Sequence, residues 1–317
     1  MRKIGVLRGG TGDEYFLSLK SGAQIMKALN DAGYDVLDML VDRNGILHIK
    51  GIPTTLETAA SQVDVVWNAI HGEIGEDGKI QALLDDIGIP YSGAGATAAA
   101  LTANKMTAKE RAREIGIRTP EAMLIMPEGG ESIAGLTQSI YRRMAPPWVV
   151  KPLVGGASIH TYLATTPLEL SQFVEESISY GQPFIVEQYI FGKEANVGVV
   201  DGLRGQEPYV LPVVEMRRPS RGILTHDELM QEGHAVVGGS FRADERERLS
   251  ALAEALHRHF GVSDYSQSAF IIDRYGKIWY LETDSIPHLT DQGAFVTALK
   301  SVGSSLGELV RTIIGRK

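Results

Sequence analysis

The first third of the chain alternates short apolar runs with segments of helical periodicity, and this alternation restricts the fold more than any other feature. Buried strands are predicted for three apolar runs, at residues 4–7, 36–40 and 63–68. Helices are predicted for residues 18–31, where Ser18 can cap the first turn, and for residues 80–87 before Gly88. Strands that alternate with helices in this way favour a βα lobe with a mostly parallel sheet, ending near Gly95.

The rest of the chain is predicted to form two further lobes, because 317 residues are too many for one compact core. Helices are expected at residues 105–115 and 244–260, and strands at 148–151, 184–189, 197–200 and 209–214. A hairpin is expected between residues 267–272 and 277–282. The polar stretch 217–239 is weakly periodic and predicts a long loop. We therefore expect an α/β protein with lobes at residues 1–96, 97–182 and 183–317.

The overall composition excludes several classes of function. A formal net charge of -8 argues against nucleic acid, whose phosphates require a basic surface. The sequence contains no cysteine, which rules out disulfides, thiolate nucleophiles and cysteine-based zinc sites. Its first apolar run is too short for a signal peptide, and no run approaches the roughly 20 residues that span a bilayer. A cytoplasmic protein without a membrane partner is expected.

Three glycine-rich turns follow predicted strands: Gly9-Gly10-Thr11-Gly12, the stretch from His71 to Gly78, and Gly155-Gly156. None has the pattern of a Walker loop or of a dinucleotide-binding turn, and each taken alone is more often an ordinary turn. The first turn lies at the carboxyl edge of the sheet, where ligands bind. Its Glu14 is either a solvated loop acid or a carboxylate that binds a substrate ammonium.

Charged residues at the ends of later strands indicate an anion and a metal. Lys151 ends a buried strand, where an unpaired ammonium is unfavourable unless an anion meets it. If residues 272 and 277 flank the hairpin turn, four side chains share one face: Gln267, Ala269, Glu282 and Asp284. The carboxylates of Glu282 and Asp284 are suitable ligands for Mg²⁺, although a bare pair of this kind is more often a solvated edge.

Several short motifs, in this order, resemble those of one known family. They are Gly9-Gly10 through Glu14, His71-Gly72, Gly75-Glu76-Asp77-Gly78, Pro90-Tyr91-Ser92-Gly93, Asn104-Lys105, Val150-Lys151-Pro152, Val186-Glu187 and Gly192-Lys193-Glu194. Together they are similar to the D-alanine–D-alanine ligases of the ATP-grasp superfamily, over nearly the whole chain. The resemblance implies a three-lobed ATP-grasp fold and an ATP-dependent carboxylate–amine ligase with Mg²⁺ or Mn²⁺. Its expected reaction forms D-alanyl-D-alanine, a cell-wall precursor, through an acyl phosphate.

The same resemblance assigns roles to individual residues. Lys105, Lys151, Gly155 and Gly156 would contact the ATP phosphates. Glu187 and Tyr189 would contact the adenine, and Glu194 would contact the ribose. The first amino acid would face Glu14 and His71, and the second His288. The expected catalytic positions are Glu14, Ser158 and Gln267, and the expected metal ligands are Glu282 and Asp284.

Several positions depart from the family pattern, and most of them are positions that the family uses for catalysis, metal binding or substrate binding. Gln267 replaces an arginine, Ala269 a metal-binding aspartate and Asp284 an asparagine. In the glycine-rich loop Ala157 replaces a serine and His160 a glycine; near the second substrate His288 replaces a glycine and Gly293 a serine. The family's tyrosine-containing loop pattern is missing from residues 217–239, where a substitute cation could come from Arg217, Arg218 or Arg221.

Three functions remain open from the sequence. The first is D-alanyl-D-alanine formation, and the second is the same chemistry with a different second amino or hydroxy acid. The third is a nucleotide-binding homologue with little turnover. A nicotinamide dehydrogenase is set aside, because the required glycine pattern is absent and Lys151 would have no role. The expected partners are amino acids and ATP, and a homodimer is possible by analogy with relatives of this type.

Overall fold

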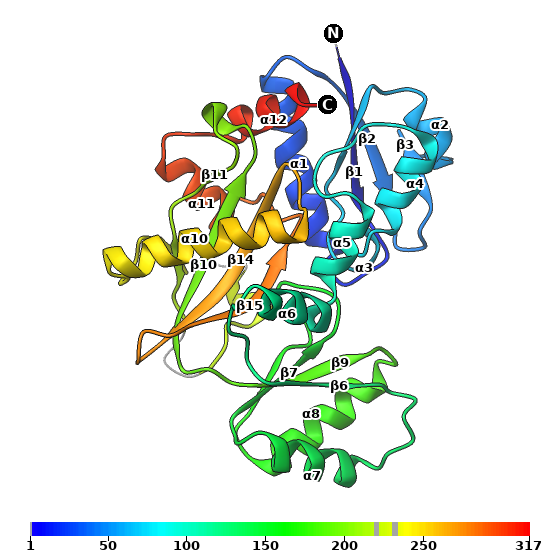
Figure 1. The fold of residues 1–317 in the computed structure, drawn as a ribbon. Helices are drawn as coiled ribbons and strands as arrows, with labels where there is room; N and C mark the ends of the chain where they lie inside the picture. Colours follow the sequence, from blue (N-terminus) through cyan, green and yellow to red (C-terminus); the bar gives the residue numbers. More distant parts are fainter. Residues whose placement is uncertain (1, 219–221, 230–233) are drawn as a thin grey trace.

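The computed structural model describes residues 2–218, 222–229 and 234–317, so that the expectation for Arg221 lies outside the described residues. Its strands form three sheets that follow one another along the chain (Figure 1). Among the described residues, no helix is both long and apolar enough to cross a bilayer.

The N-terminal lobe contains the three strands and two helices predicted for it, together with two short antiparallel strands and two short helices that were not predicted. Its sheet has the order β4-β3-β2-β1-β5, in which β1 pairs in parallel with both β2 and β5. The strands are β1 (Lys3–Gly9), β2 (Asp35–Val41), β3 (Leu47–Ile49), β4 (Ile52–Thr54) and β5 (Val65–Asn68). The helices are α1 (Tyr15–Asp31), α2 (Leu56–Ala60), α3 (Glu73–Glu76) and α4 (Lys79–Ile87). Gly88 ends α4 in the left-handed conformation, as predicted.

Ser18 has a different role from the predicted one. Helix α1 begins at Tyr15, and Ser18 is fully buried inside it. Its hydroxyl accepts a hydrogen bond from the Gly9 amide (2.8 Å) and donates one to the Ala69 carbonyl (2.7 Å). Ser18 therefore links the ends of β1 and β5, a tertiary contact that a capping pattern does not reveal.

The central sheet is antiparallel, has the order β6-β9-β7-β8, and lies at the bottom of Figure 1 with α7 and α8. Its elements are β6 (Ala122–Ile125), α7 (Ile133–Arg143), β7 (Trp148–Pro152), β8 (Tyr162–Ala164), α8 (Pro167–Ser179) and β9 (Phe184–Gln188). The boundary expected at 182/183 placed β9 in the C-terminal lobe, whereas β9 pairs with β6 and β7. An apolar run predicts a buried strand but does not specify its neighbours.

The C-terminal sheet has the order β13-β12-β10-β14-β15, with β11 beside β10. Its strands are β10 (Gly192–Val200), β11 (Tyr209–Val210), β12 (Val214–Met216), β13 (Ala235–Val237), β14 (Tyr265–Asp273) and β15 (Ile278–Asp284). The helices are η1 (Leu203–Gly205), α9 (His226–Leu229), α10 (Ala243–Phe260), α11 (Ala294–Ser301) and α12 (Leu306–Gly315). The strand predicted at 209–214 is thus two strands, and the predicted loop 217–239 contains α9 and β13.

The N-terminal and C-terminal lobes share one apolar core, whereas the central lobe has a core of its own. Trp67 of β5 stacks on Tyr265 of β14 with ring centroids 5.9 Å apart. Helices α5 (Ala96–Ala103) and α6 (Lys105–Glu114) pack against the C-terminal sheet. The Nη1 atom of Arg2 donates to the carbonyl of Ile314 (2.8 Å), which joins the two ends of the chain (Figure 1).

Candidate active site

One cavity is lined by residues from all three lobes, and every site residue predicted from the sequence lies in its wall. These residues are Glu14, His71, Lys105, Lys151, Gly155, Gly156, Ser158, Glu187, Tyr189, Glu194, Gln267, Glu282, Asp284 and His288. Positions that are separated by most of the chain are therefore brought together. Their individual roles remain predictions that rest on the family resemblance.

A buried carboxylate between two lysines organises one end of this cavity. Glu187 of β9 lies 2.7 Å from the Lys151 Nζ atom and 2.9 Å from the Lys109 Nζ atom, measured from its two carboxylate oxygens. Burial raises the pKa of Glu187, but the two ammonium groups outweigh it and lower the pKa to about 2. The pKa of Lys151 is raised, because Glu187 and Glu282 together outweigh the effect of its burial.

Lys109 does not line the cavity but supports its wall through Glu187, a contact that was not predicted from the sequence. Its side chain is fully buried, donates to the Leu281 carbonyl (3.1 Å), and has its pKa lowered to about 8, mainly by burial. A sequence signal existed, because Lys109 follows the predicted site residue Lys105 by four positions in a helix and so shares its face.

Two ammonium groups and the glycine-rich loop converge at the middle of the cavity. The Lys105 Nζ atom donates to the Gly155 carbonyl at 2.5 Å. The same Nζ atom lies 4.0 Å from a carboxylate oxygen of Glu282, which is also 3.9 Å from the Lys151 Nζ atom. Burial lowers the pKa of Lys105. An anion that enters between these lysines would replace part of the hydration that they have lost.

The glycine-rich loop adopts a backbone conformation that side chains rarely accept. Three of its non-glycine residues have positive φ: Ala157 (49°), Ser158 (55°) and His160 (51°). Left-handed non-glycine residues persist where surrounding contacts hold them, and they concentrate at ligand-binding loops. The loop lies between β7 and β8, at the end of the strand that carries Lys151.

Contacts from two other segments hold this loop in place. The Gly156 amide donates to Oε1 of Glu14 (2.9 Å), and the Nε2 atom of His160 lies 3.0 Å from Oδ2 of Asp13. The Nδ1 atom of His226 in α9 lies 3.0 Å from the Ala157 carbonyl. The first glycine-rich turn and the segment 217–239 therefore both meet the loop, across lobe boundaries.

Arg218 contributes its charge to the end of the cavity predicted to bind the nucleoside. Its guanidinium lies 2.6 Å from Glu194 Oε2 and donates to the Tyr189 hydroxyl at 3.3 Å. Arg218 is one of the three arginines that could replace the positive charge lost at position 267. In this structure its guanidinium instead forms an ion pair with Glu194. Arg217 does not belong to the cavity lining.

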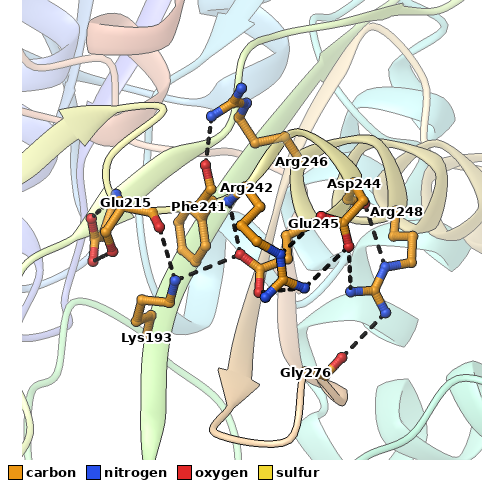
Figure 2. Close-up of polar contacts among 10 residues, drawn as sticks. Lys193, Glu215, Phe241, Arg242, Asp244, Glu245, Arg246, Arg248 and Gly276 are labelled. Atoms are coloured by element: carbon orange, nitrogen blue, oxygen red, sulfur yellow. Dashed lines mark hydrogen bonds and ion pairs between the residues drawn. The ribbon is translucent and has the colours of Figure 1, made fainter.

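Lys193, although part of a quoted motif, faces away from Glu194 because neighbouring strand residues point to opposite faces. Its Nζ atom donates to the Ser240 carbonyl (3.0 Å) and lies 3.6 Å from Glu245, over the ring of Phe241 (Figure 2). Glu215 accepts hydrogen bonds from the Ser240 amide (2.7 Å) and hydroxyl (2.9 Å). This network fixes the chain just after segment 217–239 to strands β10 and β12.

The other end of the cavity contains two histidines and three acids. The Nδ1 atom of His71 lies 3.3 Å from Glu76 Oε1, and its Nε2 atom is buried without a hydrogen bond of normal geometry. Burial, with the neighbouring His71, lowers the pKa of His288 to about 4. Burial and nearby acids raise the pKa values of Glu76 and Asp284 well above the usual range. Glu76 belongs to one of the family-like motifs but is not among the predicted site residues.

The hairpin of β14 and β15 places the expected metal ligands on one face, although its register differs from the expected one. Gln267 is opposite Asp284 and Ala269 is opposite Glu282. The expected register placed residues 272 and 277 beside the turn, whereas Ile272 is opposite Ile278 and the register shifts again at Ala269/Phe270. A β-bulge of this kind has no marker in the residue pattern.

The residues present at this hairpin suit a magnesium ion that is shared with phosphates. No group of three histidine or acidic side chains that could hold a metal occurs in the described parts of the chain. Mg²⁺ is commonly bound through one or two carboxylates, with its other ligands supplied by substrate phosphates and water. Glu282 and Asp284 provide such a pair within the cavity that contains Lys105 and Lys151.

Comparison with known proteins identifies the family. Residues 112–315 match the model of the D-Ala–D-Ala ligase C-terminus, and residues 50–94 match that of the N-terminus. The chain is 31% identical to the D-alanine–D-alanine ligase of Geobacter sulfurreducens, covering 98% of this chain and 93% of the relative. It is also 31% identical to that of Halalkalibacterium halodurans, covering 98% of each chain.

Solved structures share the fold over the whole chain. The VanG D-Ala:D-Ser ligase of Enterococcus faecalis superposes with a TM-score of 0.83 at 22% identity, covering 99% of this chain and 98% of that one. The D-alanine–D-alanine ligase of Bacillus anthracis, solved with ATP, gives a TM-score of 0.78 at 22% identity, covering 99% and 97%. The fold is therefore the ATP-grasp fold predicted from the sequence, and the chain belongs to the D-alanine–D-alanine ligase family.

Proposed function

We propose that this protein is an ATP-dependent ligase that activates the carboxylate of D-alanine and joins it to the amine of a second D-alanine. The observation that carries the proposal is the meeting of Lys105, Lys151, Glu282 and the glycine-rich loop in one cavity. These groups are suited to an anionic phosphate chain with a divalent ion. Family membership supplies the reaction, for which cell-wall precursor synthesis in the cytoplasm is the expected setting.

Phosphoryl transfer in such a site depends on positioning and on charge. Lys105 and Lys151 would neutralise charge on the migrating γ-phosphoryl group, and the loop amides would donate hydrogen bonds to it. Glu282 and Asp284 would hold Mg²⁺ or Mn²⁺, which would supply further positive charge at the phosphates. Tyr189 and Glu194 would bind the nucleoside beside Arg218, and Glu187 would keep Lys151 oriented.

The donor amino acid would lie next to the first glycine-rich turn. One carboxylate oxygen of Glu14 accepts a hydrogen bond from the Gly156 amide. The other oxygen can accept hydrogen bonds from the ammonium group of D-alanine. His71 stands in the same wall, held by Glu76. Because Glu14 also contacts the glycine-rich loop, binding of the donor and ordering of the phosphate loop would be coupled through one side chain.

We further propose that turnover of the D-alanine pair is slow. Gln267 provides no permanent charge where the family pattern has an arginine, and loss of one such donor lowers rates by about 10²–10³. A different second substrate is the alternative, because Gln267, His288 and Gly293 all line the same cavity. A homodimer is proposed by analogy alone and is checked by light scattering.

The test is release of phosphate from ATP and Mg²⁺ while D-alanine is titrated from micromolar to high millimolar concentration. We expect saturable release together with a D-alanyl-D-alanine product detected by mass spectrometry. Lys151→Met is the control and should abolish both signals. If ATP binds but no D-amino acid stimulates phosphate release, the proposed function is wrong and a binding role replaces it.

A further inference from the structure

An ion pair between Arg218 and Glu194 lies at the end of the cavity that is predicted to bind the nucleoside. The Arg218 Nε atom donates to Oε2 of Glu194 at 2.7 Å, and its Nη2 atom lies 2.6 Å from the same oxygen. Both side chains line the cavity, and only 11% of the arginine side chain and 20% of the glutamate side chain is exposed. Because charge-assisted hydrogen bonds from a guanidinium are short and directional, the pair fixes the orientation of the carboxylate.

The pairing of two strands brings Arg218 to this position. Glu194 of β10 is opposite Met216, the last residue of β12, and Arg218 follows Met216 by two positions. The Arg217 amide donates to the His234 carbonyl (2.7 Å), so that the pairing of β12 with β13 continues for one more residue. Alternate residues of an extended chain face the same side, and Met216 and Arg218 accordingly both line the cavity, whereas Arg217 is exposed.

Arg218 also contacts the residue predicted to bind the adenine. Its Nη1 atom donates to the Tyr189 hydroxyl at 3.3 Å, and its guanidinium carbon lies 5.8 Å from the centre of the Tyr189 ring. The Tyr189 hydroxyl in turn donates to the Gly222 carbonyl (3.2 Å). One guanidinium therefore links the predicted adenine and ribose contacts, and segment 217–239 contacts both of them.

Without a cation beside it, Glu194 would oppose the binding of a nucleoside triphosphate. The triphosphate is strongly anionic, and a carboxylate in a partly dehydrated wall would repel it. Burial lowers the pKa of Arg218, but the charge of Glu194 outweighs burial and raises that pKa, so that the guanidinium stays ionised. The pair is therefore neutral overall, and an acid can line the cavity next to an anionic ligand.

The geometry of the pair leaves one oxygen of Glu194 for a ligand. Both contacts from Arg218 are made to Oε2, so that Arg218 does not use Oε1. A ribose hydroxyl is a hydrogen-bond donor, and each oxygen of a carboxylate has lone pairs that accept such a bond. An ionised acceptor forms a stronger hydrogen bond than a neutral one, so a fixed Oε1 atom would favour a nucleotide that has its ribose hydroxyls.

We propose that Arg218 is a positioning residue for the nucleotide, which orients Glu194 for the ribose hydroxyls, offsets its charge, and so makes the site selective for a ribonucleotide. The inference rests on the ATP-binding part of the proposed function and names a determinant of nucleotide specificity in that site. Arg218 then acts through Glu194 rather than through the phosphates.

The experiment measures nucleotide binding by the protein in the absence of amino acids. Dissociation constants of ATP and of 2′,3′-dideoxy-ATP, which lacks both ribose hydroxyls, are determined with Mg²⁺ by isothermal titration calorimetry. We expect wild type to bind ATP at least tenfold more tightly, because a hydrogen bond to a charged group contributes about a factor of ten or more. Equal affinity for the two nucleotides overturns the inference.

Two neighbouring arginines provide the variant and its matched control. Arg218→Met removes the charge and should reduce the preference for ATP to less than about threefold, together with a loss of affinity common to both nucleotides. Arg217→Met removes the same charge from the exposed neighbour, which does not line the cavity, and should leave both dissociation constants unchanged. If Arg218→Met lowers the affinity for both nucleotides by the same factor and keeps the preference, the inference is wrong.

A double variant tests whether Arg218 acts through Glu194. Glu194→Met removes the predicted acceptor and should abolish the preference for ATP even with Arg218 present. Glu194→Met/Arg218→Met removes the unpaired carboxylate as well, and should bind 2′,3′-dideoxy-ATP at least threefold more tightly than Arg218→Met alone. No recovery in the double variant would mean that Arg218 contributes its own charge to the phosphates, against the inference.

Binding and ligation together separate failure of this inference from failure of the proposed function. If ligation occurs but the preference for ATP is absent or independent of Arg218, only the inference is wrong. If the preference depends on Arg218 but no D-amino acid stimulates phosphate release, the inference about the nucleotide stands and the ligase function fails. Absence of ATP binding overturns both.

Discussion

Replacing Glu187 should be much more damaging to stability than replacing Lys109 beside it. The carboxylate is 3% exposed and contacts Lys109 and Lys151 at 2.9 and 2.7 Å. Its pKa is lowered from 4.5 to about 2, and a shift of this size corresponds to about 3 kcal/mol in favour of the ionised folded state. Glu187→Gln removes that stabilisation and leaves two buried cations without their partner, so we expect a loss of about 3–5 kcal/mol.

The matched control is Lys109→Met. The pKa of this lysine is lowered from 10.5 to about 8, mainly by burial, so its charged form is itself held at a free-energy cost. Methionine fills similar space, and Lys151 still pairs with Glu187. We therefore expect Lys109→Met to reduce the free energy of unfolding by only about 1–2 kcal/mol.

Urea unfolding followed by circular dichroism measures both variants at neutral pH. Because the folded pKa of Glu187 lies below the unfolded value, its stabilisation is complete above pH 4.5 and is lost as the pH falls towards about 2. The difference between wild type and Glu187→Gln should shrink over that interval. Equal losses for Glu187→Gln and Lys109→Met, or a difference that does not change with pH, would refute the reasoning.

Three further changes test other parts of the site. Ala269→Asp should lower the Mg²⁺ concentration for half-maximal activity about tenfold, because it adds a carboxylate opposite Glu282; an unchanged metal titration would count against the expected metal position. Glu14→Gln should raise the KM for donor D-alanine about tenfold with a smaller change in the KM for ATP, as seen in steady-state kinetics; equal changes would contradict a donor role. Gly293→Ser should cost about 1–3 kcal/mol by urea unfolding because of the His288 ring, and much less in a His288→Gly background; equal costs in both backgrounds would exclude that contact.

The sequence predicts those parts of the site that depend on one residue and its near neighbours in the chain. Lys151 ends a buried strand, and a buried ammonium indicates an anion whatever the surrounding fold. The first two glycine-rich turns follow β1 and β5, whose carboxyl ends meet at a common edge, so that their convergence follows from the βα order. The third follows β7 of the central sheet, and its approach to the other two does not follow from that order. Each of these signals lies within a few residues of the position that it predicts.

The features that the sequence missed depend on contacts between distant segments. Ser18 has the residue type of a helix cap, but its hydroxyl is used by Gly9 and Ala69. Lys109 supports the site, without lining the cavity, only because Glu187 from another lobe contacts it. The pairing of β9 with β6 and β7 likewise cannot be read from its apolar residues, because all buried strands have a similar composition.

The register of the β14–β15 hairpin places the replaced residues 267, 269 and 284 in two facing pairs, so that their charges act together. Ala269 is opposite Glu282 and Gln267 is opposite Asp284, so the family's aspartate and this chain's Asp284 occupy successive pairs on one face. The negative charge has therefore been moved along the hairpin rather than lost, towards the end that contains His71 and Glu76. An arginine at 267 would there be paired with Asp284 and partly neutralised. The loss of the arginine and the gain of the carboxylate are therefore physically linked, and together they change the charge of the site at which the second amino acid would bind.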